Sequence, residues 1–233
     1  MDEAPPPPWR RTSTPRRTSI DTDVVVAAGL ELLDAEGVDS LSMRRLAAKL
    51  GVSAGLLYRY LNDKDELLDL LLEEVLGEVA PTRSEDWQAD LRGLATQIHG
   101  ALLSHRDVAR IAVTRIVPTG PNALRVAEAL LECLRRAGLD DDQLSPAADA
   151  VSALVQGSAL EHGLDPERHL PGEGSVDERL RAIGQYFTSL PATTFPVIRS
   201  LGPRMSAGTA EERFAFALDI VVRGIAATVR ARA

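Results

Sequence analysis

The sequence has little of several residues that define particular classes of protein. It contains one cysteine, Cys133, so no disulfide can form within the chain and no cysteine-based zinc site is available. It contains no apolar run of about 18 residues, the minimum for a membrane-spanning helix. The first residues also lack the apolar core of a signal peptide. We therefore expect a cytoplasmic protein that has no membrane partner.

Recognisable catalytic patterns are missing as well. The four histidines, His99, His105, His162 and His169, include no pair with the spacing of a zinc motif. We find no glycine-rich phosphate loop, nucleophile elbow or pair of carboxylates on convincing structure. We therefore predict neither an enzyme nor a metal site. Cys133 lies in an apolar helical pattern and is expected to be a small buried residue rather than a redox sensor.

Negative charge prevails, with a net charge of −8, but its distribution is uneven. Residues 10–19 hold four arginines and no acid, and residues 42–64 hold five basic residues against Asp63, so each segment carries +4. The rest of the chain must then carry −16 to reach the total. Such an asymmetry orients a protein on a polyanion, with the two basic segments toward the phosphates.

The first basic segment reads as an arm. Residues 1–19 are rich in proline and arginine and offer almost nothing to bury, so we expect them to be disordered. Two roles remain open: a solvated tail without function, or an arm whose arginines reach the minor groove of DNA.

The second basic segment contains two short helical patterns joined by a glycine. Met43 to Leu50 has apolar residues at helical spacing behind a capping Ser42, and Gly51 supplies the turn. Ser53 can cap a second helix, Ala54 to Tyr60, whose Leu57 faces inward while its basic and aromatic residues face outward. This geometry places a helix in a major groove, although ordinary helical bundles also contain such pairs.

The remaining patterns are also helical, so we predict an all-α protein. We assign residues 20–66 to a helix-turn-helix domain and residues 67–233 to a larger helical domain. Beyond the two short helices, the expected helices are Thr22 to Gly37, Lys64 to Val79, Ser84 to His105, Asp107 to Val117, Asn122 to Ala137, Leu144 to His162, Val176 to Leu190 and Thr209 to Arg230. Residues 165–175 and 191–208 are expected to be mostly irregular.

The N-terminal domain resembles that of the TetR (tetracycline repressor) family of bacterial regulators. The resemblance covers roughly residues 22–78 and depends on Ala28, Gly37, Leu41, Arg44, Leu46, Ala47, Leu50 to Ser53, Leu57, Tyr58, Tyr60, Lys64, Leu67 and Leu68. It implies double-stranded DNA as partner, with contacts from Ser42, Arg44, Gly55, Leu56, Tyr58, Arg59, Tyr60 and Lys64. In this resemblance Tyr58 and Lys64 hold phosphates, and Arg44 meets a phosphate or a guanine edge. The residues that face base edges are Gly55, Leu56, Arg59 and Tyr60. Arg59 is the candidate for reading guanine, because arginine best matches that base edge. A phosphate contact is the alternative role for Arg59.

The second half resembles the C-terminal domain of tetracycline repressors in three segments: Leu102 to Asp107, Ala150 to Glu161, and Glu212 to Phe214 with Leu218. The resemblance implies a homodimer whose interface is formed by Leu144 to His162 and Thr209 to Arg230. A two-fold dimer holds its two reading heads about 34–36 Å apart and so requires a palindromic operator.

The same resemblance implies a small-molecule effector that releases a repressor from its operator. Tetracycline repressors hold their drug with magnesium and a histidine, but Ala112 occupies the matching position and cannot bind a metal. We therefore expect no cofactor, and magnesium stays open as the alternative. An Asn and a Phe that contact the drug correspond to Leu94 and Ile98, whereas Thr114, Arg115 and Glu161 match the family. We expect an apolar pocket lined by Leu94, Ile98, Leu102, Ala112 and Val155, with Arg115, Gln156 and Glu161 as polar anchors. Alternatively, these are plain core residues, and the domain is only a dimerisation scaffold of a ligand-independent DNA-binding regulator.

Overall fold

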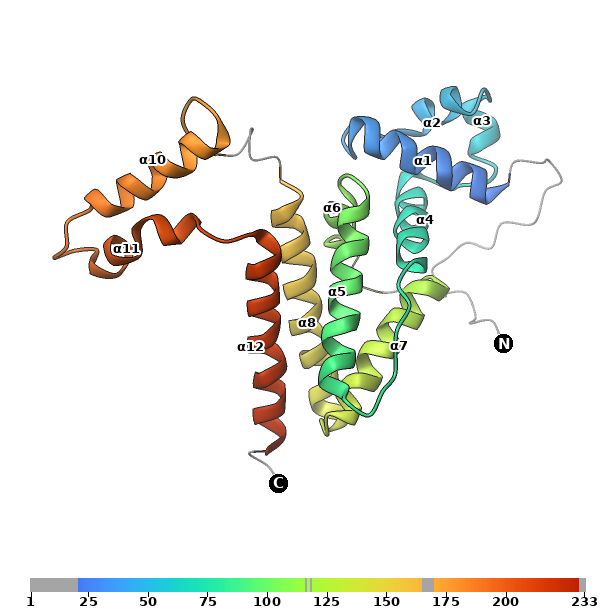
Figure 1. Ribbon diagram of the computed structural model, residues 1–233. Helices are drawn as coiled ribbons and strands as arrows, with labels where there is room; N and C mark the ends of the chain where they lie inside the picture. Colours follow the sequence, from blue (N-terminus) through green and yellow to red (C-terminus); the bar gives the residue numbers. More distant parts are fainter. Residues whose placement is uncertain (1–20, 116, 118, 165–169, 231–233) are drawn as a thin grey trace. The chain divides into compact units, whose positions relative to one another are not determined.

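The computed structural model describes residues 21–115, 117, 119–164 and 170–230 of the chain, and every regular element among them is a helix (Figure 1). The predicted all-α class is therefore confirmed, whereas the predicted basic arm lies outside the described residues. The helices are α1 (Thr22–Glu36), α2 (Met43–Lys49), α3 (Ala54–Leu57), α4 (Lys64–Gly77), α5 (Trp87–Ser104), α6 (Val108–Ala112), α7 (Pro121–Arg136), α8 (Asp141–His162), α10 (Val176–Ser189), α11 (Pro196–Leu201), the 3-10 helix η1 (Gly202–Ser206) and α12 (Ala210–Arg230).

Short polar side chains start the N-terminal helices, as their sequence positions predict. The hydroxyl of Ser42 accepts a hydrogen bond from the Arg45 backbone N–H at 3.3 Å, and that of Ser53 accepts one from Leu56 at 3.2 Å. Each bond satisfies one of the backbone donors that a helix leaves unpaired at its first turn. Gly51, between the two helices, has φ +67°, a conformation that costs other residues strain.

The described residues up to Gly163 and from Leu218 onward form one compact unit. Helix α4 connects the first three helices to the rest of this unit. It packs against α1 on one side and against α5, α6 and α7 on others. Its Leu67, Leu71 and Val75 are completely buried, which agrees with the prediction of a helix enclosed by other helices. A shift of α4 would therefore change its packing both against the helix-turn-helix domain and against the larger domain.

Residues 191–208 differ from the expected irregular segment. They contain α11 and η1, and each has a proline within its first two positions, Pro196 and Pro203. Proline is compatible with a helix there because the backbone N–H that it lacks has no partner within the helix. With α10 these elements form most of a second compact unit, Leu164–Ala217, which sequence patterns alone did not separate from the larger domain.

Smaller differences concern helix ends. Helix α8 begins at Asp141 rather than Leu144, because Asp140 and Gln143 cap each other's backbone N–H groups. Helix α3 ends at Leu57 instead of Tyr60, and the chain continues as turns that bond back to Leu57. Within the described residues, no helix combines the length and apolar character that a membrane crossing requires.

Candidate DNA-reading surface and effector cavity

Helix α3 is held by one side chain and presents the others outward. Leu57 has no exposed surface, and it is the buried residue of this helix. Tyr58 is 53% exposed and Arg59 is exposed beside it, while Leu56 and Tyr60 are partly exposed. A Cβ at Gly55 would meet no atom within 4 Å, so the backbone there lies open to an approaching ligand. The surface predicted to contact base edges is therefore accessible.

Ion pairs divide the basic residues near α3 into two groups. Glu36 and Glu31 of α1 pair with Arg45 and Lys49, at 2.5 and 2.6 Å respectively. Arg44 and Arg59 are exposed and take part in no ion pair with the residues that the structure describes. Arg44 and Arg59 are therefore the arginines of this surface whose charge no described carboxylate pairs, a distinction that net charge alone could not make.

Lys64 has a structural partner in addition to its predicted phosphate role. Its Nζ donates a hydrogen bond to the Val38 carbonyl at 2.9 Å, which connects the start of α4 to the turn after α1. An ammonium group has three donors, so two remain for a phosphate. Ser42 likewise uses its oxygen as an acceptor in capping α2, and its hydroxyl proton remains available.

The larger domain contains a partly open cavity of about 520 Å³, a size typical of small-molecule sites. Residues of α4, α5, α6, α7 and α8 line it. Six of the eight predicted effector residues are among them: Ile98, Leu102, Ala112, Arg115, Val155 and Gln156. Side chains that lie up to 58 positions apart in the sequence thus meet around one space.

Leu94 and Glu161, the other two predicted residues, do not line the cavity. Leu94 is buried in the core, and two helical turns, about 12 Å, separate it from Leu102 along α5. Glu161 is exposed near the end of α8, on a face rotated by about 140° from Gln156. Two predicted residues therefore lie on helices that line the cavity but do not line it themselves.

Two walls of the cavity were not predicted from the sequence. Helix α7 contributes Ala123, Val126, Ala127, Leu130 and Leu131, and α4 contributes Asp69, Leu72, Glu73 and Leu76. Periodicity identified α4 as buried and α7 as a helix, but the same apolar pattern is produced by a closed core. The polar residues Ser145, Asp149 and Ser152 of α8 also line the cavity. Their spacing on one helical face was a signal that could have found them.

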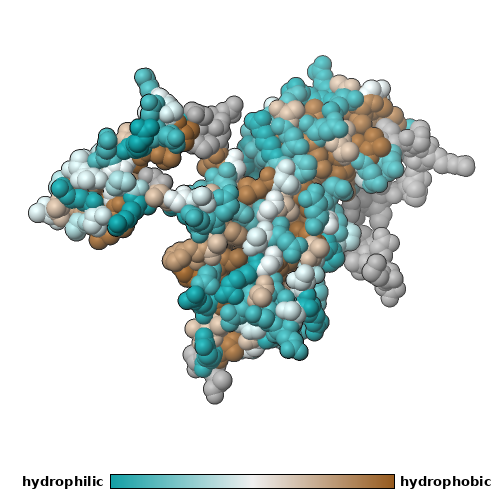
Figure 2. All heavy atoms as spheres, viewed as in Figure 1, coloured by the Kyte–Doolittle hydropathy of each residue, from teal (hydrophilic) through white to brown (hydrophobic). Residues whose placement is uncertain are grey.

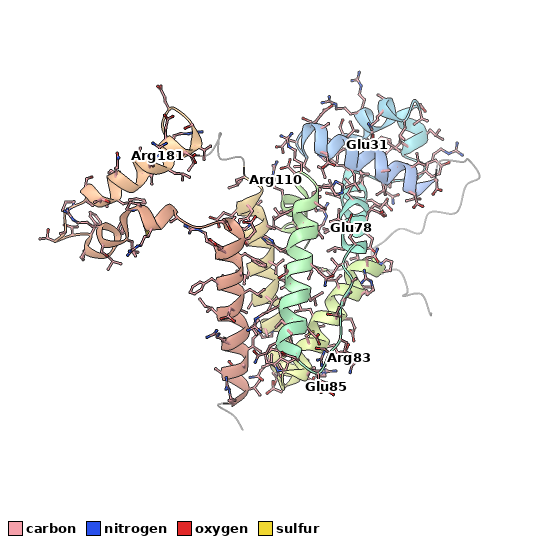
Figure 3. The ribbon with its side chains drawn as sticks, viewed as in Figure 1. Glu31, Glu78, Arg83, Glu85, Arg110 and Arg181 are labelled. Carbon is pink, nitrogen blue, oxygen red and sulfur yellow. The ribbon has the colours of Figure 1, made fainter. Side chains whose placement is uncertain are left out.

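Two contacts connect α6 with the turn that precedes α2. Asp107 has a left-handed backbone, φ 62°, and its carboxylate accepts a hydrogen bond from the Val38 backbone N–H at 2.9 Å. Arg110, labelled in Figure 3, pairs with both carboxylate oxygens of Asp39 at 3.0 Å. This guanidinium holds the pKa of Asp39 below its usual value, chiefly through the hydrogen bond.

Further polar contacts extend from both ends of the α6 region. His105 Nδ1 lies 2.8 Å from a carboxylate oxygen of Asp34 in α1. Arg115, which lines the cavity, donates to Asp69 at 2.5 Å and to Asp65 at 3.0 Å, both on α4. The segment from His105 to Arg115, which contributes Ala112 and Arg115 to the cavity, is therefore bonded to both α1 and α4.

Comparisons with known proteins agree with this geometry. Residues 25–71 match the family described as bacterial regulatory proteins, tetR family, and residues 80–229 match the tetracyclin repressor-like C-terminal domain. The chain belongs to the TetR family. An HTH-type transcriptional regulator of Saccharopolyspora erythraea is 34% identical over 230 residues, which cover 97% of this chain and 93% of that one. A class G tetracycline repressor of Vibrio anguillarum is 40% identical over 168 residues, 70% and 79% of the two chains.

Solved structures extend this similarity to three dimensions. ActR from Streptomyces coelicolor in complex with actinorhodin superposes on this TetR-family chain with a TM-score of 0.80 and 35% sequence identity. The match covers 91% of this chain and 99% of ActR. The predicted membership of the family and its tetracycline-repressor-like C-terminal domain are therefore confirmed.

The residues of the cavity do not fit the magnesium site expected of tetracycline repressors. Ala112, which the resemblance to tetracycline repressors matches with their metal-binding histidine, lines the cavity and has no donor atom in its side chain. His99 and His162 pack edge to face, with ring centroids 5.0 Å apart. However, no group of three His, Cys, Asp or Glu side chains among the described residues could hold a metal ion.

Proposed function

We propose that this TetR-family regulator is a homodimeric repressor that a small molecule releases from a palindromic operator, without a metal. The observation that carries the proposal is the bonding of one cavity wall to the reading domain. Arg115 lines the cavity and pairs with α4, while Arg110 and Asp107 of the same short segment hold the turn before α2. As a repressor, the protein would bind DNA in the cytoplasm and would catalyse no reaction.

Exposed apolar residues support the dimer. Phe216 and Ile220, one turn apart on α12, are 70% and 56% exposed, and Figure 2 shows hydrophobic atoms gathered over the middle of this helix. Gly157 of α8 has open space around it, as does Gly224 of α12. Small residues allow close approach of a second helix, and exposed large apolar residues gain from being covered. Two copies joined by a two-fold axis read two symmetric half-sites.

The effector acts by binding one conformation of the larger domain more tightly than the other. A ligand in the cavity contacts α4, α6, α7 and α8 together, so it favours whichever arrangement of these helices fits it best. If that arrangement moves α4, the two reading heads no longer match the operator spacing. Effector and operator then weaken each other's binding, with a typical coupling of about 1–3 kcal/mol. The complex of ActR with actinorhodin supports a ligand-responsive role for this fold.

Selection of bound sequences from a random DNA pool tests the proposal, with and without a panel of apolar drugs and metabolites. A palindrome should be enriched, and one compound class should abolish its recovery. Enrichment of a palindrome that no compound affects would contradict the effector role. Failure to enrich any palindrome would contradict the dimeric repressor itself.

The selected operator then allows a test of individual side chains. Arg59→Ala should relax base preference at one position per half-site, by about 1–3 kcal/mol of discrimination. Arg45→Ala is the matched control, because Arg45 is already paired with Glu36. Equal weakening of all sequences by Arg59→Ala would assign Arg59 to a phosphate instead.

A further inference from the structure

A polar stripe runs along the cavity-facing side of α8. It consists of Ser145, Asp149, Ser152 and Gln156, all of which line the cavity. Their spacings of four, three and four residues place them on one face of the helix. None of these four side chains takes part in a hydrogen bond or ion pair with any other residue that the structure describes. The stripe is therefore available to a ligand along three turns of helix.

The walls formed by α5 and α7 are apolar. Ile98 and Leu102 of α5 and Val126 and Leu130 of α7 line the same cavity. A ligand that fills the space must therefore bury an apolar body on one side and present polar groups toward α8 on the other.

The described cavity lining has more acidic than basic residues, and most of these charged groups already have bonding partners in the protein. Among the lining residues that the structure describes, Asp69, Glu73 and Asp149 are acidic, and Arg115 is the one basic residue. Arg115 is paired with Asp69, and it also donates to Asp65. Glu73 accepts hydrogen bonds from backbone N–H groups at the start of α7, including that of Ala123 at 3.1 Å. Asp149 is thus the lining carboxylate left without a counterion or donor in the described part of the chain.

From this arrangement we infer that the effector is an apolar molecule with a cationic amine, which Asp149 binds while Ser145, Ser152 and Gln156 accept its remaining polar groups. The inference rests on the proposed function and adds the chemical class of the ligand. Asp149 is exposed although it lines the cavity, so its carboxylate keeps part of its water and attracts a cation chiefly through its charge. A neutral ligand gains nothing from this charge. An anionic ligand would meet an excess of carboxylates and one guanidinium that already has acidic partners.

Three anthracenes that differ in one substituent test the charge preference on the full-length protein. They carry an aminomethyl, a hydroxymethyl or a carboxylate group on the central ring and are respectively cationic, neutral and anionic at pH 7. Their own fluorescence reports binding in a direct titration. The amine should bind about 2- to 5-fold more tightly than the alcohol, as expected for an ion pair with an exposed carboxylate. The carboxylate should bind most weakly.

Asp149→Asn preserves the shape of the side chain and removes its charge. It should reduce the affinity for the amine to nearly that for the alcohol and leave the affinity for the alcohol unchanged. Asp142→Asn is the matched control, because Asp142 is, like Asp149, an exposed acid of the same helix, but it does not line the cavity. This control should keep the preference for the amine.

The outcomes separate this inference from the proposed function. If the alcohol or the carboxylate binds as tightly as the amine, or if Asp149→Asn keeps the preference, the inference is wrong. The proposed function would survive that result, since a neutral or anionic effector can still fill the cavity. If none of the three probes binds, both the inference and the use of this cavity as effector site are overturned.

Discussion

Leu57 and Tyr58 are adjacent in α3 but should respond to mutation in opposite ways. Leu57 has no exposed surface and is the buried residue of a helix of four residues, whereas the side chain of Tyr58 is 53% exposed. Isolated helices of this length are unstable in water, so α3 depends on Leu57 for its position. Removing a buried leucine side chain typically costs about 2–5 kcal/mol. That is a large part of the total stability of a domain, about 5–15 kcal/mol.

The expected results follow from this contrast. Leu57→Ala should lower the free energy of unfolding by about 2–5 kcal/mol and abolish operator binding, because α3 loses its anchor. Tyr58→Ala should change stability by no more than about 0.5 kcal/mol, as is usual at exposed positions. It should nevertheless weaken operator binding about tenfold by removing one phosphate contact.

Two measurements on each variant check these values. Urea unfolding followed by circular dichroism gives the stability, and fluorescence anisotropy with a labelled operator gives the affinity. A loss below about 1 kcal/mol in Leu57→Ala would refute the role of Leu57 as the anchor of α3. A destabilisation of Tyr58→Ala equal to that of Leu57→Ala would refute the division of this helix into an inner and an outer face.

Three further predictions concern other parts of the chain. Burial raises the pKa of the Cys133 thiol, so a thiol reagent such as Ellman's reagent should react with the folded protein far more slowly than with the urea-unfolded protein, and equal rates would contradict this. Gly51→Ala should destabilise the protein by about 1–2 kcal/mol in urea unfolding, because φ is +67° although space for a methyl group is available; an unchanged midpoint would contradict the backbone strain. The Ser84 backbone hydrogen bond, with support from Arg136, lowers the pKa of Asp90. The stabilisation from ionised Asp90 is therefore present above about pH 4 and lost as the pH falls through its lowered pKa. Asp90→Asn should make the decline of Tm between pH 5 and pH 2 shallower, and parallel curves would rule out this contribution.

Local features of the reading domain could be predicted from the sequence because their causes lie within a few residues. Ser42 and Ser53 cap helices whose first turns follow them directly, and Gly51 provides a turn that other residues adopt only with strain. The inward face of Leu57 follows from its spacing to neighbouring apolar residues. The amphipathic pattern and the helix signals identified the all-α class for the same reason.

The tertiary structure decided which side chains meet. Arg44 and Arg45 are adjacent and chemically identical, yet only Arg45 is paired with Glu36, because α1 passes beside that one. Leu94 and Leu102 share a helix, yet only Leu102 reaches the cavity. Helical periodicity tells that a face is covered but not whether a core or a cavity covers it. That difference depends on the packing of α4, α7 and α8 against α5 and α6, which joins residues far apart in the chain.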